Sequence, residues 1–227
     1  MKATISGDII ASTALSTKGR AALEKRLKKL IQLLKKEFGI YARVIKGDYL
    51  ECYIPDPEEA LRVALIIKCF IKSHPIDVKS KKREIALFRM HGIRLAIGLG
   101  PITRFNPRKG IIDGEAIYLS GRLISRQSNP HGERMVIKST LFIDATIRPV
   151  VDEFEPVLAL LDVLLAKCTA RQCEVLTLKL TGLNEETIAS QLKITQATVN
   201  QHSRSAGWNA IEKTVNRFNQ AIKNLPK

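Results

Sequence analysis

The spacing of apolar residues along the first 150 positions changes repeatedly between the period of strands and the period of helices. Short segments rich in β-branched residues and bounded by turn residues predict strands, which are expected at 2–11, 40–46, 49–54, 92–99 and 133–138. Apolar residues that recur every three or four positions predict helices at 17–38, 57–72 and 114–127. The order βαββαβ, followed by one further helix and strand, predicts an α+β domain with a ferredoxin-like split βαβ sheet covered by helices.

The last third of the chain shows helical spacing throughout, so we expect two domains. The α+β domain would extend over residues 1–150 and an all-α domain over residues 151–227. Apolar residues after Pro156 predict a connecting helix. A capping-box pattern formed by Thr169 and Gln172 predicts that the next helix begins there.

Two further capped helices are predicted within residues 184–206. Asn184 precedes a short helix with two glutamates in its first turn, and Thr195 precedes the next helix. The apolar residues of this segment are spaced to pack between two crossing helices, and they are Ile188, Ala189, Leu192, Ile194 and Val199. This arrangement predicts a helix-turn-helix, the motif that places its second helix in the major groove of DNA. The alternative is an αα-hairpin with a polar outer face.

The second helix of this motif carries side chains suited to nucleic-acid recognition. Asn and Gln pair with adenine edges and Arg with guanine edges, while hydroxyl groups contact phosphates or cap turns. The candidate DNA-binding residues are Thr195, Gln196, Ala197, Thr198, Asn200, Gln201, Ser203 and Arg204. This helix is therefore predicted to read double-stranded DNA.

Residues 169–210 resemble the DNA-binding part of sigma-factor region four and of response-regulator output domains. In that family the turn between the two helices usually contains Gly, and this chain has Lys193 there. We therefore expect a left-handed lysine or a less usual turn. The helix that begins at Gly207-Trp208 has an apolar face, which would pack on the core of the same chain or form a dimer contact.

Two aspartates lie where predicted strands meet turns. Asp8 is close to the end of the first strand, and Asp48 occupies the tight turn between the next two strands. Because these strands are neighbours in the predicted topology, the two carboxylates are candidate ligands of one Mg²⁺ ion that carries a phosphate. The alternatives are that Asp8 caps a turn through its side chain and that Asp48 is a turn residue. Lys46 would be a phosphate ligand or a solvated surface residue.

The segments around these aspartates resemble motifs of the class III nucleotidyl cyclases. The resemblance covers about residues 3–138 and rests on four segments, which are Asp8–Thr13, Lys46–Tyr53, Arg94–Pro101 and Gly114–Arg122. It implies a cyclase-like fold with a metal site and a nucleotide site. The residues that it implies are Asp8 and Asp48 for the metal, and Ser12, Thr13 and Arg122 for the nucleotide.

Three departures from the cyclase pattern argue against cyclisation of ATP or GTP. The family has Asn where this chain has Tyr118, and it has base-recognising polar residues where this chain has Val44 and Ile111, which are expected to be buried. The whole arrangement is most similar to SatD-like proteins, which open with a similar strand and close with a helix-turn-helix. The first domain is therefore expected to serve in dimerisation, in nucleotide sensing or in both. The alternative is an active nucleotidyl cyclase or nucleotide-hydrolysing enzyme that uses Asp8 and Asp48.

Charge and composition narrow the classes of partner. The net charge of +15 favours a polyanion such as double-stranded DNA. The excess of positive charge lies mostly before residue 153, and part of it is in the basic loop 73–83.

The four cysteines show no zinc-ligand spacing and are expected to be reduced structural residues. The absence of an apolar run of about 18 residues predicts no membrane span, and no signal-peptide pattern is present, which predicts a cytoplasmic protein. The sequence thus predicts a DNA-binding transcription regulator, a homodimer, with a nucleotide effector and Mg²⁺ as candidate ligands.

Overall fold

The computed structural model describes residues 1–45, 47–74, 82–128 and 139–225. Its strands are β1 (Lys2–Ile9), β2 (Tyr41–Ile45), β3 (Tyr49–Ile54), β4 (Ile93–Gly100), β5 (Arg104–Asn106), β6 (Ile111–Asp113) and β7 (Leu141–Ala145). Its helices are α1 (Thr17–Phe38), α2 (Ala60–Lys72), α3 (Lys82–His91), α4 (Glu115–Ser128), α5 (Arg148–Lys167), α6 (Ala170–Leu180), α7 (Glu185–Leu192), α8 (Gln196–Ser205) and α9 (Trp208–Lys223). Short 3-10 helices, η1 (Ser12–Ala14) and η2 (Pro57–Glu59), precede α1 and α2. The strand expected at 133–138, Lys46 and most of the basic loop lie outside the described residues.

Within the described ranges, five strands form one sheet in the order β2-β3-β1-β4-β7. β1 pairs antiparallel with both β3 and β4, and β3 pairs antiparallel with β2. β3 therefore lies between β1 and β2, which is the split βαβ arrangement predicted from the sequence. β7 extends the sheet by pairing parallel with β4. The register places Ile5 opposite Cys52 on one side and Ile97 on the other, and all three are buried.

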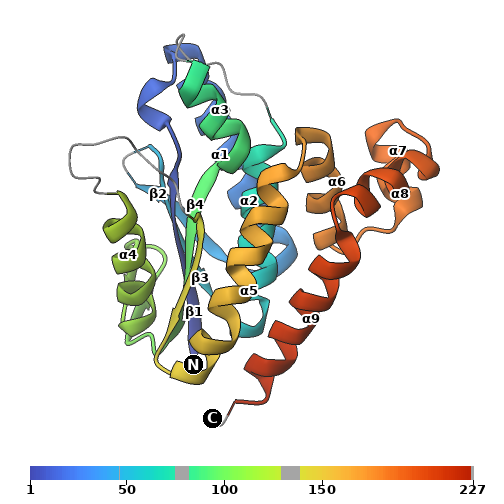
Figure 1. The fold of residues 1–227 in the computed structure, drawn as a ribbon. Helices are drawn as coiled ribbons and strands as arrows, with labels where there is room; N and C mark the ends of the chain where they lie inside the picture. Colours follow the sequence, from blue (N-terminus) through green and yellow to red (C-terminus); the bar gives the residue numbers. More distant parts are fainter. Residues whose placement is uncertain (46, 75–81, 129–138, 226–227) are drawn as a thin grey trace.

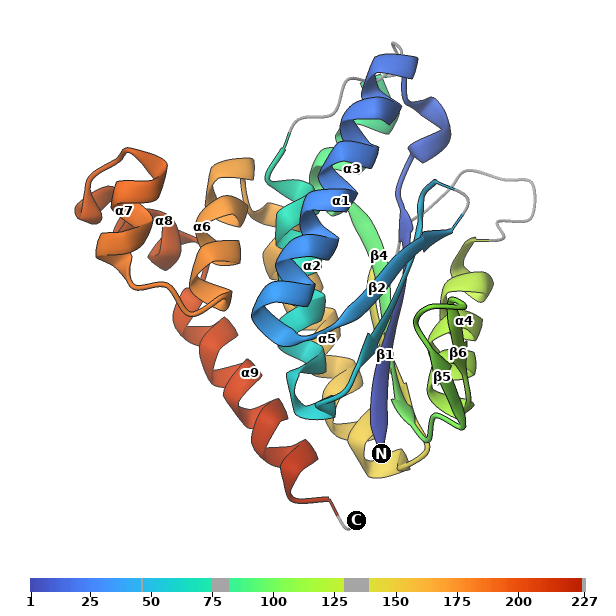
Figure 2. The same cartoon turned by 180° about the vertical axis from the view of Figure 1, so that it is seen from behind.

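Helices cover the two faces of the sheet unequally (Figures 1 and 2). α1, α2 and α5 pack on one face, whereas α4 and the small β5–β6 hairpin lie on the other. The apolar side chains of the first face form the main core, which continues into α6 and α9. The chain is thus a mixed α/β sheet domain followed by a helical region. The boundary between residues 150 and 151 stays a prediction, since one core extends across it.

Three elements of the described residues are not predicted by the spacing of the sequence. They are α3, the β5–β6 hairpin and β7, since the last strand is expected at 133–138 and β7 lies at Leu141–Ala145. All three depend on packing against distant segments. Phe105 of the hairpin stacks on Tyr53 with ring centroids 4.0 Å apart and meets the ring of Tyr41 edge-on at 5.6 Å. Tertiary contacts of this kind have no local signature.

The connecting helix α5 begins at Arg148 and contains Pro156, whereas the sequence places its start after that proline. Proline removes one backbone hydrogen bond inside a helix. Phe154 and Leu158, on either side of Pro156, are buried, and this packing holds the helix continuous.

Neither α5 nor any other helix of the described residues is both long and apolar enough to cross a membrane.

Candidate nucleic-acid interface

Three consecutive helices, α6, α7 and α8, each begin at a residue whose side chain caps the helix. Thr169 takes part in the predicted capping box. The backbone N–H of Thr187 donates to Asn184 Oδ1 at 2.8 Å, and the N–H of Thr198 donates to Thr195 Oγ1 at 3.1 Å. Each cap satisfies a backbone donor that the first turn otherwise leaves unpaired. The starts of these helices therefore follow directly from the local sequence.

The turn between α7 and α8 is closed by Lys193 in a left-handed backbone conformation. Its φ of 54° and ψ of 47° lie in a region that glycine adopts readily and other residues adopt rarely. The N–H of Ile194 donates to the carbonyl of Ala189 at 3.0 Å, which ends α7 and reverses the chain. The expectation of a left-handed lysine in this turn is confirmed.

A small apolar cluster, separate from the main core, holds the three helices together. Val175 of α6, Ile188 and Ala189 of α7, and Val199 of α8 are buried in it. The partly buried residues packed around them are Leu178, Leu183, Leu192 and Ile194. Every apolar residue that the sequence places between the crossing helices belongs to this cluster, which confirms the helix-turn-helix geometry.

Most of the predicted DNA-binding residues lie on the solvent-facing side of α8. The exposed ones are Thr195, Gln196, Ala197, Asn200, Gln201 and Arg204. Thr198 is half-buried, with its hydroxyl 2.9 Å from Thr195 Oγ1 at the helix cap. Ser203 was wrongly placed on this side, because it is only 2% exposed and its hydroxyl donates to the carbonyl of Asn200 at 3.0 Å. It lies one helical turn after the buried Val199 and therefore shares that inner face.

A groove of about 400 Å³ follows the exposed face of α8, and it is lined by Ala197, Asn200, Gln201, Arg204 and Ser205. Ser205 is not among the residues expected from the sequence. The sequence could have indicated it, because Ser205 lies one helical turn after Gln201 and both residues therefore share one face of α8. The groove thus presents two amides, a hydroxyl and a guanidinium to one ligand.

Asn200 is held by a polar link that reaches three other helices. Its Nδ2 donates to Glu185 Oε2 at 3.4 Å, and Lys179 Nζ donates to Glu185 Oε1 at 2.8 Å. The hydrogen bond from Lys179 lowers the pKa of Glu185. The Lys179 ammonium also lies 5.1 Å from the ring centroid of Trp208 on α9. The Asn200 amide is therefore engaged within the protein, through a glutamate that is itself paired with Lys179.

The apolar face of α9 is used within the chain. Its buried residues, all part of the main core, are Ile211, Val215, Phe218 and Ile222. Phe218 meets Phe154 of α5 edge-on with ring centroids 4.9 Å apart, and Asn219 Nδ2 donates to Glu59 Oε1 at 3.0 Å. Of the two alternatives for this face, packing on the core of the same chain is the one observed.

The predicted metal pair lies at one end of the sheet, where β1 and β3 meet. The N–H of Ile9 donates to the carbonyl of Asp48 at 3.2 Å, so the fold does bring Asp8 and Asp48 close in space. Their carboxylates have different partners. Asp8 Oδ2 pairs with Arg94 at 3.0 Å, and Asp48 Oδ2 accepts a 2.5 Å hydrogen bond from the Ser12 hydroxyl. Across the described segments, no group of three or more His, Cys, Asp or Glu is placed to hold a metal ion.

The other residues implied by the cyclase resemblance are spread over several elements. Ser12 and Thr13 lie in η1, whereas Arg122 is exposed on α4. Val44 and Ile111 are half-buried and not buried as expected. The reason is that β2 is an edge strand and β6 belongs to the two-stranded hairpin.

Comparison with known proteins gives a family match for the C-terminal region and structural similarities for the sheet domain. Residues 166–206 match the model of a family described as bacterial regulatory proteins, luxR family. No curated protein matches the chain. Two solved structures, each described as a bacterial light-regulated adenylyl cyclase, are similar over 62% of this chain with a TM-score of 0.38. They are 14% and 17% identical to it, and the match covers 42% and 74% of their chains, so this chain spans less than half of the first.

Similarity at that level does not bear on function, and the resemblance to SatD-like proteins stays a prediction. The C-terminal region differs from the sheet domain, because its helix-turn-helix geometry and its family match coincide in the same residues. Together they support a DNA-binding regulatory protein whose helix-turn-helix region is similar to the luxR family.

Proposed function

We propose that this protein is a transcription regulator in which α8 reads the major groove of double-stranded DNA. The observation that carries this proposal is one exposed face of a capped helix that presents Gln196, Asn200, Gln201 and Arg204. Amides of this kind pair with adenine edges and guanidinium groups with guanine edges. α7 and α8 stand at the outer edge of the molecule (Figure 1), where a duplex can approach them.

Selection of bound fragments from a random DNA pool tests this proposal. The salt concentration must be fixed near physiological values, because a protein with a net charge of +15 also binds phosphates without sequence preference. We expect recovery of one sequence motif, and an inverted repeat would follow from two copies of α8 related by a two-fold axis. Recovery of no motif contradicts reading by α8.

A triple variant locates the recognition. Gln196→Ala, Asn200→Ala and Arg204→Ala together should abolish the preference for the selected motif, since each base contact contributes roughly 1–3 kcal/mol of discrimination. The matched control replaces two amides and one cation at the far end of α9, and it combines Gln220→Ala, Lys223→Ala and Asn224→Ala. Unchanged preference in the α8 variant would rule out this helix as the reader.

The proposal includes a homodimer with a nucleotide effector in the sheet domain. A two-fold dimer would present two recognition helices to an operator of matching symmetry, and sedimentation with and without operator DNA measures it. The closeness of Asp8 and Asp48 supports a nucleotide site with Mg²⁺, although the ion would have to displace Arg94 from Asp8.

Calorimetry with ATP, GTP and cyclic nucleotides in the presence of Mg²⁺ tests the effector. No heat from any of them contradicts the effector and leaves the DNA result untouched. Formation of a cyclic product or release of phosphate would instead indicate the enzymatic alternative that uses Asp8 and Asp48.

A further inference from the structure

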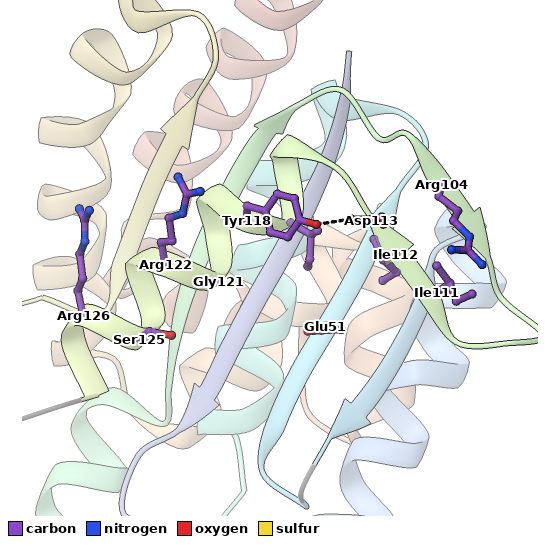
Figure 3. A pocket seen from close by; sticks show the side chains of 11 residues that line it. Glu51, Arg104, Ile111, Ile112, Asp113, Tyr118, Gly121, Arg122, Ser125 and Arg126 are labelled. Atoms are coloured by element: carbon purple, nitrogen blue, oxygen red, sulfur yellow. Dashed lines mark hydrogen bonds between the residues drawn. The ribbon is translucent and has the colours of Figure 1, made fainter.

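A second groove, of about 610 Å³, lies on the face of the sheet that carries α4. It is bounded by α4, by the β5–β6 hairpin and by Glu51 of β3 (Figure 3). This volume is in the range of small-molecule sites. The groove is far along the chain from the helix-turn-helix and shares no residue with the groove on α8.

The wall opposite α4 is fixed by contacts with the sheet. The ring of Phe105 stacks on Tyr53. Arg43 donates to the carbonyl of Gly110 in the hairpin, and it also pairs with Glu51 Oε2 at 2.6 Å. The hairpin is therefore attached to β2 and β3 by an aromatic stack and by contacts of the Arg43 guanidinium.

The groove has an unbalanced positive charge. Arg104, Arg122 and Arg126 line it and are exposed, and none of their guanidinium groups forms an ion pair or hydrogen bond with another residue of the described segments. The two carboxylates of the lining already have partners. Glu51 pairs with Arg43, and Asp113 accepts a hydrogen bond from the Tyr118 hydroxyl. Three guanidinium groups are thus left for an anion.

Gly121 lies on α4 at the floor of this groove, and the packing of the protein does not require a glycine there. A Cβ at this position would meet only the Tyr49 hydroxyl, at an ordinary 3.9 Å. Gly98 is different, because a Cβ there would lie 2.1 Å from the carbonyl of Ala116. Glycine inside a helix destabilises it, so Gly121 carries a cost that intramolecular packing does not explain. The missing side chain leaves space next to Tyr118 and Arg122.

We propose that this groove binds a small organic anion, with a carboxylate or phosphate group attached to a flat or apolar body. Arg122 and Arg126 lie one helical turn apart on α4, as Figure 3 shows, and guanidinium groups bind both kinds of anion through paired hydrogen bonds. The body lies in the space above Gly121, against Ile117 and the half-exposed ring of Tyr118. Ser125, exposed on the same wall, donates its hydroxyl to the anion.

Arg122 is also one of the residues implied for a nucleotide, so this inference rests on the proposed effector site and assigns it a groove and a ligand class. Calorimetric titration of the full chain without DNA or Mg²⁺ tests the groove, and its outcome depends neither on DNA binding nor on a metal ion at Asp8 and Asp48. The probes are phenyl phosphate, inorganic phosphate and benzyl alcohol at constant ionic strength. Phenyl phosphate should bind at least about tenfold more tightly than either of the others, because only it uses both the guanidinium groups and the apolar floor. Equal binding of benzyl alcohol and phenyl phosphate, or no binding of any probe, overturns the proposal.

Two variants then locate the bound probe. Arg126→Gln should weaken phenyl phosphate by about tenfold, the loss of one charge-assisted contact, while Arg20→Gln on exposed α1 should leave it unchanged. Gly121→Leu should abolish binding and keep or raise Tm, since it fills the floor and removes a helix glycine. If Gly121→Leu lowers Tm, Ser125→Leu fills the same wall from an exposed position. Retained affinity in both filling variants overturns the site.

AMP extends the series to a phosphate with a larger flat body. Tighter binding of AMP than of phenyl phosphate, lost in Gly121→Leu, supports the site and narrows its ligands to nucleotides. AMP binding that survives both filling variants overturns the assignment of the anion to this groove.

Discussion

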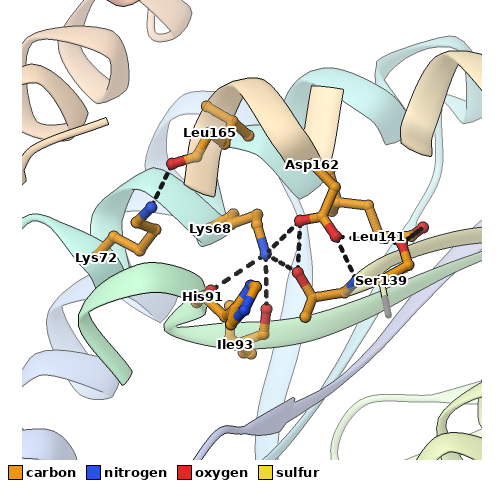
Figure 4. A network of polar contacts seen from close by, with 9 residues as sticks. Lys68, Lys72, His91, Ile93, Ser139, Leu141, Asp162 and Leu165 are labelled. Atoms are coloured by element: carbon orange, nitrogen blue, oxygen red, sulfur yellow. Dashed lines mark hydrogen bonds and ion pairs between the residues drawn. The ribbon is translucent and has the colours of Figure 1, made fainter. Parts of the chain in front are cut away.

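Lys68 Nζ lies 3.3 Å from Asp162 Oδ1, and the two side chains are only 0% and 7% exposed (Figure 4). The ammonium also donates to the carbonyls of His91 and Ile93, both at 3.1 Å. Both the N–H and the hydroxyl of Thr140 donate to the Asp162 carboxylate. This buried ion pair therefore joins α2, the start of β4, the segment before β7 and α5. It attaches the helix that leads into the helix-turn-helix to the sheet.

Removing one partner of this pair should destabilise the whole chain. Lys68→Met leaves a buried carboxylate without its cation, which costs roughly 3–5 kcal/mol of the free energy of unfolding. The double variant Lys68→Met with Asp162→Leu should recover most of that loss, because it leaves no buried charge. Urea unfolding measures both, with Lys18→Met on the exposed face of α1 as the control. Equal stability of the single variant and the wild type would show that the pair contributes nothing.

The same pair should make stability depend on pH at the acid end. Burial by itself would raise the pKa of Asp162, but the Lys68 ammonium and the hydrogen bonds from Thr140 outweigh it and hold the pKa below its usual value. A carboxyl whose pKa is lower in the folded state contributes stability above its unfolded pKa, and this contribution is lost as the pH falls through the folded value. The free energy of unfolding should therefore fall below about pH 4. Asp162→Asn should show a smaller fall over the same range.

The left-handed lysine in the turn between α7 and α8 predicts an unusual response to glycine. Lys193→Gly relieves a conformation that costs an ordinary residue about 1 kcal/mol, although the more flexible unfolded chain offsets part of the gain. Amide exchange in α7 and α8 should therefore be unchanged or slower. Gln191→Gly, at a neighbouring exposed helical position, should accelerate exchange instead, because glycine weakens a helix. Faster exchange in both variants would contradict the assigned turn.

The contact between Asn200 and Glu185 predicts how a charge-removing variant changes DNA binding. Glu185→Gln removes a negative charge near the phosphates and weakens the hold on the Asn200 amide, so affinity for the selected motif should rise by about 2- to 10-fold at low salt. Glu186→Gln removes the same charge from a neighbouring exposed position. A competition assay against non-specific DNA separates the two effects. Only the Glu185 variant should change preference at the base that Asn200 contacts.

The close approach of α4 to the sheet predicts opposite effects for two glycines. Gly98→Ala forces a methyl group to within 2.1 Å of the Ala116 carbonyl, so α4 must shift, at a cost of roughly 1–3 kcal/mol. Gly121→Ala meets no such atom and should raise the free energy of unfolding by roughly 0.5–1 kcal/mol. Thermal unfolding of the two variants checks the pair. A stabilising Gly98→Ala would mean that α4 does not pack this closely.

Several features of this protein follow from its sequence alone. The caps at Thr169, Asn184 and Thr195 join atoms only a few residues apart, so the starts of α6, α7 and α8 need no knowledge of the rest of the fold. Apolar residues with regular spacing likewise identify β1, β2, β3 and β4 of the sheet and the long helices that bury a face, whereas β7 is not predicted. The resemblance of residues 169–210 to domains that usually have Gly in this turn also predicted a left-handed Lys193 or a less usual turn, and the left-handed conformation is the one found.

Only the tertiary structure decided which polar groups are free to act. Ser203 is a hydroxyl on a polar-looking helix, yet it faces inward because α8 packs its Val199 side against α6 and α7. Asp8 is a candidate metal ligand by residue type and position, but only the fold shows that Arg94, from a strand far along the chain, pairs with its carboxylate. The groove at Gly121 exists because a hairpin without a sequence signature folds back over β2 and β3. Such pairings depend on distances between segments remote in sequence, and local spacing carries no information about those distances.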